Sequence, residues 1–161
     1  MKKILSLTLA LTMIGTILTG CGAKDAAVKT PAENTQQEQS QTEKALALIN
    51  TFATGDTDTA RSLLSDGYIQ HNLAYGTGAD AFVGSVEYLA SADVKTTVNN
   101  IRAFEDGAKV FLQTIYNFAG AGEQVAFDIF RFDEDGKIAE HWDVMETIAD
   151  QSTWQNENGK F

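Results

Sequence analysis

The residue types best suited to proton transfer lie in the carboxy-terminal half of the chain. His141 and Asp143 are two positions apart in a segment of alternating character, and residues at that spacing point to the same face of a β-strand. Imidazoles titrate near neutrality, and burial in an apolar cavity raises the pKa of a carboxyl group toward the range useful for catalysis. The pair therefore predicts an oriented proton-transfer site. The alternative is that both side chains face solvent or make structural hydrogen bonds.

Asp128 is a third candidate, because it interrupts the otherwise apolar segment 125–130. A buried charge is costly unless it is paired or lies in a polar pocket. Strand alternation places Asp128 on the same face as Phe130, so we expect both at a cavity, with Asp128 as a base or as a partner of a ligand's polar group. The alternatives are an ion pair with Arg102 or Arg131 and an exposed position on an edge strand.

A second group of candidates lies in the early segment YIQHN, which contains Tyr68, His71 and Asn72. An amide can hold a carbonyl or enolate oxygen by a hydrogen bond, and a phenol can donate its hydroxyl. We therefore count all three as ligand-binding candidates, although His71 fits equally well as a residue that caps a helix or closes a loop. Tyr116, in a later strand, is a further ligand-binding candidate whose favoured alternative is a place in the core.

Residue counts and spacing disfavour several other classes of site. A single cysteine rules out, within this sequence, an intramolecular disulfide, a zinc site with several thiolates and an iron–sulfur cluster. The two histidines show no HxH, HxxxH or HExxH spacing, so we expect no metal and no cofactor. The 161 residues include 12 basic and 22 acidic side chains, a net charge of −10. This balance argues against nucleic-acid binding, because phosphate contacts come from Lys and Arg.

The elements that must position these side chains follow from hydrophobic periodicity and turn signals. Apolar residues at three- and four-residue spacing and the capping residues predict three early helices. The predicted elements are a helix over 43–54, a short helix between the cap at 56–58 and Asp66, an extended segment over 68–72 and a helix over 79–91.

From Val94 onward the pattern becomes that of strands separated by acidic or glycine-rich turns. It predicts four antiparallel strands, at about 94–104, 108–118, 123–132 and 138–148. Helices followed by a run of long strands are typical of an α+β fold in which a curved sheet wraps the helices.

Three segments resemble a known family: YIQHN at 68–72, FDIFRF at 127–132 and DGKIAEHWDV at 135–144. Over residues 44–148 the chain resembles the SnoaL-like group of the nuclear transport factor 2-like superfamily. The resemblance implies a cone-shaped, curved antiparallel sheet of about four to five strands wrapped on three helices, around a mostly apolar pocket. Such proteins include polyketide cyclases that work by aldol chemistry without metal or cofactor, isomerases, dehydratases and domains of no known activity. The cyclases use an acid–base Asp near the position of Asp143, which here directly follows Trp142.

The amino-terminal segment predicts export and lipid attachment. Residues 1–20 combine two lysines near the start with an apolar stretch, as a signal peptide does. The sequence LTGC at 18–21 resembles a bacterial lipobox, which makes Cys21 the predicted lipid-bearing first residue of the mature protein. The alternatives are an uncleaved anchor and a free thiol. We therefore expect attachment to the cell membrane on its extracytoplasmic face.

Residues 21–43 predict a flexible tether, because positions 22–43 contain no aromatic residue, Leu or Ile. The SnoaL-like domain is expected over 44–161. The expected partners are a small-molecule ligand, the membrane through the lipid anchor, and a second copy of the chain. Such a homodimer would form through the outer face of the sheet, where Thr96, Val98 and Ile101 are candidates for an apolar patch.

These observations predict a lipid-anchored protein that binds a small, largely apolar molecule in its cone cavity. If it is an enzyme, we expect cofactor-free proton transfer beside a carbonyl group, in an aldol-type cyclisation, isomerisation or dehydration. Asp128 or Asp143 would be the base and His141 the orienting or proton-shuttling partner, with Asn72 or Tyr68 stabilising the oxygen. The alternative is a non-catalytic ligand-binding or accessory lipoprotein.

Overall fold

The computed structural model describes residues 39–161, so the predicted signal peptide, Cys21 and most of the tether lie outside the described residues. Short 3₁₀ turns cover Phe118–Gly120 and Gln151–Thr153. In chain order the main elements are α1 (Gln41–Thr54), α2 (Thr57–Leu63), β1 (Leu64–Gln70), α3 (Ala79–Ser91), β2 (Thr97–Asp106), β3 (Lys109–Asn117), β4 (Glu123–Phe132) and β5 (Ile138–Thr147). Within residues 39–161, no helix combines the length and the apolar content that crossing a membrane requires.

Helix α1 begins two residues before the predicted start, because Ser40 and Glu43 form a capping box there. The Ser40 hydroxyl accepts a hydrogen bond from the Glu43 N–H, and the Glu43 carboxylate accepts one from the Ser40 N–H. The helix ends at Gly55, which has a φ of 74° and donates its N–H to the Thr51 carbonyl. Both ends are therefore set by local sequence, and the glycine at the carboxy-terminal end is the one that the sequence predicts.

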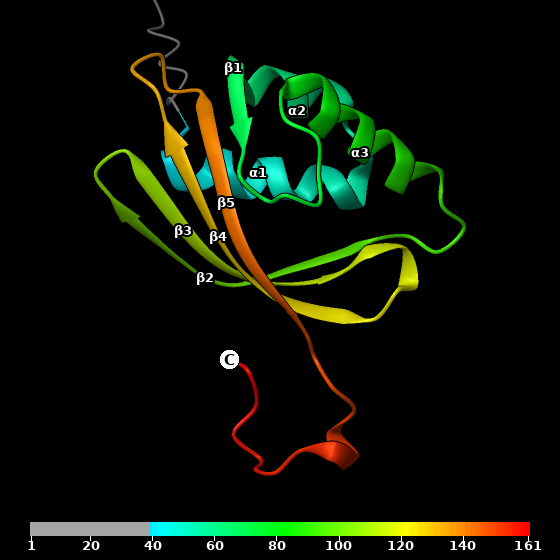
Figure 1. Cartoon of the computed structure of the whole chain (residues 1–161). Helices are drawn as coiled ribbons and strands as arrows, with labels where there is room; N and C mark the ends of the chain where they lie inside the picture. Colours follow the sequence, from blue (N-terminus) through cyan, green and yellow to red (C-terminus); the bar gives the residue numbers. More distant parts are fainter. Residues whose placement is uncertain (1–38) are drawn as a thin grey trace, which may run out of the picture. The chain divides into compact units, whose positions relative to one another are not determined.

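The other two helices also follow the local signals. The Asp56 carboxylate caps α2 by accepting the Thr59 N–H at 2.9 Å. Helix α3 spans Ala79–Ser91, the predicted range, and buries Phe82, Val83 and Val86. The three helices together lie on one face of the sheet (Figure 1).

The α+β architecture with a curved five-stranded sheet is confirmed, in the strand order β1-β5-β4-β3-β2. Strands β2 to β5 form the expected antiparallel meander. The prediction of a wholly antiparallel sheet is wrong at one edge, because β1 pairs with β5 in parallel. Parallel neighbours need a long crossover connection, and here α3 and the three strands β2 to β4 provide it.

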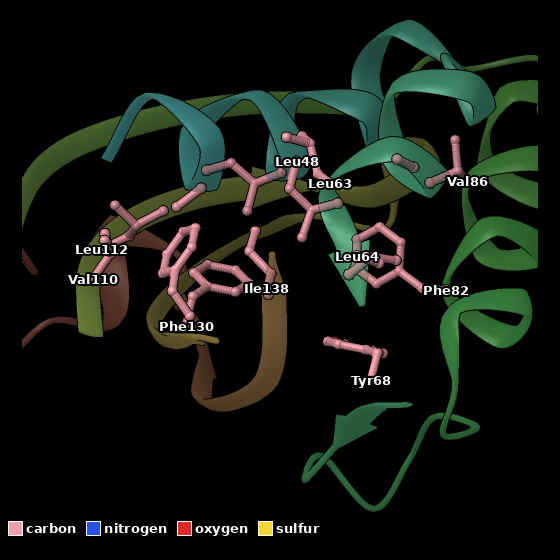
Figure 2. Close-up of a cluster of buried hydrophobic side chains, with 14 of the residues drawn as sticks. Leu48, Leu63, Leu64, Tyr68, Phe82, Val86, Val110, Leu112, Phe130 and Ile138 are labelled. Atoms are coloured by element: carbon pink, nitrogen blue, oxygen red, sulfur yellow. The ribbon is translucent and has the colours of Figure 1, made fainter. Parts of the chain in front are cut away.

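The core lies between the helices and the inner face of the sheet. Leu48 of α1 and Val86 of α3 are fully buried there against Phe130 and Ile138 of the last two strands. Figure 2 shows these side chains converging with Leu112 of β3 and with Leu63 and Leu64 at the junction of α2 and β1. Burial of large aliphatic and aromatic side chains contributes most of the favourable free energy of folding.

The predicted dimer patch does not form as described. Thr96 is buried, and its hydroxyl accepts the Ala119 N–H, while Val98 packs against the core. Both side chains therefore lie on the inner side, as residues two positions apart in an extended segment do. The outer face instead exposes Phe127 and Val144, which are paired across β4 and β5.

The carboxy-terminal segment contacts part of this outer face. The Gln113 amide donates to the Lys160 carbonyl at 2.9 Å, and the Lys160 ammonium pairs with Glu146 at 2.6 Å. Figure 1 shows the segment after β5 on the side of the sheet opposite the helices. The homodimer stays a prediction, with Phe104, Phe127 and Val144 among the exposed apolar side chains of that face.

Two glycine substitutions should change stability in opposite directions. Gly55→Ala should destabilise the protein by about 1 to 2 kcal/mol, because alanine disfavours a positive φ and its Cβ would lie 2.8 Å from the Ala90 Cβ. Gly84→Ala, inside α3 with open space around the new Cβ, should stabilise it by about 0.5 to 1 kcal/mol. Urea denaturation of both variants measures the difference, and equal effects would contradict this account of Gly55.

Candidate functional site

A cavity of about 670 Å³ lies between the helices and the inner face of the sheet. Helix α1 contributes Ile49 and Phe52, and α3 contributes Phe82, Ser85 and Tyr88. The strands contribute most of the polar side chains of the wall. These are Gln70, Tyr116, Gln124, Asp128, His141 and Asp143. The cavity therefore joins a largely apolar wall to a compact polar wall on the sheet.

Asp128 is the most deeply buried carboxylate of the cavity, with an exposed fraction of 4%. Alternation along β4 points it inward together with Phe130. Its Oδ2 accepts the Tyr116 hydroxyl at 3.0 Å, and its Oδ1 lies 3.1 Å from the His141 Nε2. The alternative of an ion pair with Arg131 is not realised, because Arg131 pairs with Glu140. Two neutral donors thus hold this buried carboxylate.

The hydrogen-bond pattern also assigns the tautomer of His141. The Gln70 Oε1 accepts the Asn72 N–H at 2.9 Å, so the Gln70 amide nitrogen is the atom that lies 3.1 Å from the His141 Nδ1. An amide NH₂ only donates, so Nδ1 accepts and Nε2 carries the proton. His141 is therefore a neutral imidazole that donates to Asp128. Its ring stacks on Phe130, with centroids 4.4 Å apart.

Tyr116 remains a hydrogen-bond donor over the whole physiological pH range. Burial of its hydroxyl, followed by the negative charge of Asp128, raises the pKa of Tyr116 well above its ordinary value. The pKa of Tyr68 is also raised, first by burial and then by Asp143 and Asp128. Both phenols therefore stay protonated beside the carboxylates.

Asp143 is more accessible than Asp128 and faces the same cavity. The two residues occupy directly paired positions of β4 and β5. The Asp143 Oδ1 accepts the Asn72 amide at 2.7 Å, and its Oδ2 has no hydrogen-bond partner within residues 39–161. Asp143 is thus an oriented carboxylate with one oxygen available to a ligand.

The fold brings together three potential metal ligands that are scattered in the sequence. One ligand atom each of Asp128, His141 and Asp143 lies within 4.8 Å of the others. Both ring nitrogens of His141 are engaged, Nε2 with Asp128 and Nδ1 with Gln70. A cation at this position would have to break the His141–Asp128 hydrogen bond and remove the Nε2 proton. The geometry is that of a hydrogen-bonded Asp128–His141 pair with Asp143 beside it.

The other predicted site residues are distributed around Asp128, His141 and Asp143. Phe130 and Tyr116 line the cavity, while Tyr68 lies behind it, where its hydroxyl accepts the Gln70 amide at 3.3 Å. Asn72 reaches the site through Asp143.

The prediction that His71 binds the ligand does not fit the structure, because its side chain lies outside the cavity lining. It stacks on Trp142 with centroids 4.4 Å apart, and its Nε2 is 3.2 Å from Glu140. Gln70 and His141 are paired in the parallel β1–β5 register. Their neighbours His71 and Trp142 therefore turn to the opposite side of the sheet, as strand alternation requires.

Gln70 is the functional residue that the sequence analysis missed. It contacts His141, Tyr68 and the backbone of Asn72, and so links the early YIQHN segment to the late strands. Its spacing of two residues from both Tyr68 and Asn72 was the available signal, because alternate residues share a face. Its contact with His141 depends on the parallel pairing of β1 with β5, which the sequence pattern does not predict.

The profile of the SnoaL-like domain matches residues 45–141, the part of the chain that builds this site. The chain belongs to the SnoaL-like domain family. No curated protein sequence matches it. This SnoaL-like chain is nevertheless similar in fold to many solved structures.

Three solved structures illustrate the fold of this SnoaL-like protein. An NTF2-like protein of unknown function from Cytophaga hutchinsonii has a TM-score of 0.59 at 16% identity, covering 69% of this chain and 94% of its own. An LEH-like epoxide hydrolase from M. tuberculosis has a TM-score of 0.58 at 19% identity, covering 66% and 82%. The proposed polyketide cyclase IdmH from Streptomyces antibioticus has a TM-score of 0.54 at 17% identity, covering 67% and 93%. At these identities the similarity establishes the fold alone.

The tautomer of His141 gives a direct test of the role of Gln70. In the His71→Gln variant, which keeps His141 as its one histidine, ¹⁵N NMR of the ring should show a neutral imidazole protonated at Nε2. Adding Gln70→Leu should allow the other tautomer or a doubly protonated ring, because the donor to Nδ1 is lost. Gln124→Leu, which alters another cavity glutamine, is the matched control and should leave the spectrum unchanged. An Nδ1–H tautomer in the parent variant would contradict the assignment.

Proposed function

We propose that this protein binds a small, largely apolar molecule in the cavity and transfers a proton beside a carbonyl group of that molecule, without a cofactor. Its membership of the SnoaL-like family supports a small-molecule-binding, cyclase or isomerase function. The observation that carries the proposal is the pair of carboxylates, Asp128 and Asp143, at directly paired positions of one cavity wall. A neutral His141 is hydrogen-bonded to Asp128 beside them. Isomerisation, aldol-type cyclisation and dehydration all begin with such a proton transfer.

In this proposal Asp143 is the base. One of its oxygens is oriented by Asn72 and the other is open to the cavity. It removes a proton from the carbon beside the carbonyl, and the electron pair of that C–H bond moves to the carbonyl oxygen as an enolate. The protonated Asp143 then returns the proton to a different atom of the same molecule in an isomerisation. In a cyclisation, the enolate carbon attacks a second carbonyl of that molecule, and the new alkoxide takes the proton.

The remaining polar side chains position this base and the substrate. Asp128, held by Tyr116 and His141, keeps a fixed negative charge beside Asp143. Asn72 already donates to Asp143 and Tyr68 lies behind the wall, so neither is free to meet the enolate oxygen. The Gln124 amide lines the cavity and is the better-placed donor for that oxygen.

The second candidate function is non-catalytic binding of a small molecule. The observation in its favour is that Tyr116, Asp128, His141 and Gln70 form a continuous chain of hydrogen bonds. A polar network whose members are satisfied by one another rigidifies a core and does not require a reaction. The same cavity would then hold a ligand with Asp143 as its polar contact.

Substitution of the base separates the two functions. In D₂O, the wild-type protein should catalyse deuterium incorporation beside the carbonyl of at least one member of a panel of apolar ketones and aldehydes, followed by mass spectrometry. Asp143→Asn should lower that rate by about 10²- to 10⁴-fold, the usual contribution of a general base, while binding of these uncharged carbonyl compounds changes little. Asp106→Asn, at an exposed aspartate in the β2–β3 hairpin, is the matched control and should behave as wild type.

Two outcomes would contradict the proposed mechanism. If ligands bind but no carbonyl compound exchanges or reacts, the protein is a binding protein. If exchange occurs and Asp143→Asn retains it in full, the base is not Asp143, and the proposed mechanism is wrong.

We further propose that Cys21 is lipidated and anchors the protein to the membrane on the extracytoplasmic face. The lipobox-like sequence LTGC at 18–21 supports this proposal. Bacterial cells expressing the wild-type chain should contain it in the membrane fraction, with an acylated Cys21 in the amino-terminal peptide by mass spectrometry. Cys21→Ala should move it to the soluble fraction or leave the signal uncleaved, and Thr35→Ala should have no effect. An unmodified Cys21 in membrane-bound protein would contradict the proposal.

A further inference from the structure

The charged groups that line the cavity are of one sign. Asp128 and Asp143 are the carboxylates of the lining, and within residues 39–161 the lining contains no Lys or Arg. His141 contributes no positive charge, because its Nδ1 accepts the Gln70 amide and only its Nε2 carries a proton. The cavity wall is therefore electrically negative.

The hydrogen-bond partners of these carboxylates do not neutralise them. Asp128 receives a phenol O–H and an imidazole N–H, and Asp143 receives the amide of Asn72. All three donors are uncharged groups. The negative charge of the pair is thus stabilised by dipoles but remains available to attract a positive charge in the cavity, where few polar groups screen it.

The rest of the wall is rich in aromatic rings. Such rings attract cations to their faces and offer apolar surface to a hydrocarbon body. Phe52, Phe82, Phe118 and Phe130 line the interior with Tyr116, and Tyr75 and Tyr88, which are exposed in part, border the opening. Aromatic walls together with acidic groups are the elements of a site for an organic cation.

We propose that the ligand of this cavity is an apolar organic cation, with an ammonium group beside the Asp128–Asp143 pair and a hydrocarbon or aromatic body against the phenylalanine-lined wall. The inference rests on the proposed function for the location of the site and adds the charge of the ligand. In the catalytic form of that function, the substrate is a carbonyl compound that also bears an amine. Anionic molecules such as carboxylates are disfavoured, because they would meet two carboxylates and no basic side chain of the lining.

Three probes of similar size and different charge test the preference. They are benzyltrimethylammonium, its uncharged carbon isostere neopentylbenzene, and the anion 3-phenylpropanoate. Titration of the wild-type protein, followed by ¹H–¹⁵N NMR, should show the ammonium probe binding at least tenfold more tightly than the isostere. The anion should bind more weakly than either. The affinity of the ammonium probe should fall as salt is added, because its attraction is electrostatic.

A pair of variants locates the charge that is responsible. Asp143→Asn should reduce the advantage of the ammonium probe over the isostere at least tenfold, while binding of the isostere stays within about threefold of wild type. Asp106→Asn removes the same charge from an exposed hairpin and should leave the advantage intact. The comparison of the three probes on the wild-type protein stands by itself if the Asp143→Asn variant does not fold.

The outcomes separate the inference from the proposed function. Equal or tighter binding of the isostere or the anion overturns the charge preference and leaves an apolar binding cavity in place. A preference that survives in Asp143→Asn overturns the assignment of the preference to the charge of Asp143. Absence of binding by all three probes overturns the inference. The proposed function also fails if no carbonyl compound of the exchange panel binds or reacts.

Discussion

The buried carboxylate of Asp128 is the constraint on which the site depends. A carboxylate that is 4% exposed must receive hydrogen bonds, and here two neutral donors, Tyr116 and His141, supply them. Each donor must in turn be held in place. Strand β3 carries Tyr116, whose burial keeps it protonated, and β5 carries His141, whose ring is fixed by Phe130 and Gln70. The polar wall is therefore a product of the assembled sheet.

The parallel pairing of β1 with β5 joins the two halves of the chain at this wall. It sets Gln70 opposite His141 and brings Asn72 within 2.7 Å of Asp143. Helices α1 and α2 lead into β1, and α3 follows it and closes the other side of the cavity. Any change in the β1–β5 register would separate the amides from the groups that they orient. The edge strand is thus a functional element as well as a structural one.

The electrostatic character of the site follows from the same contacts. The neutral imidazole of His141 lies between the amide donor of Gln70 and the carboxylate acceptor of Asp128, so the three residues form a directional chain of hydrogen bonds in place of an ion pair. Such a chain leaves the charge of Asp128 and Asp143 uncompensated by the protein, in a wall that is otherwise apolar or aromatic. Both a base that acts on a bound molecule and an anchor for a cation require this combination, because low polarity strengthens each interaction with the carboxylates.

Local sequence determined the helices, the antiparallel meander and the inward faces of β4 and β5. Caps such as Ser40 and Asp56, the turn glycines, and the alternation that places Asp128 and Asp143 are properties of neighbouring residues. Tertiary structure decided the remainder. The side of the sheet that His71 occupies, the direction of β1 and the contact of Gln70 with His141 all depend on which strands become neighbours. Strand pairing joins residues about 70 positions apart, and its energy comes from packing over the whole sheet, so no short segment encodes it.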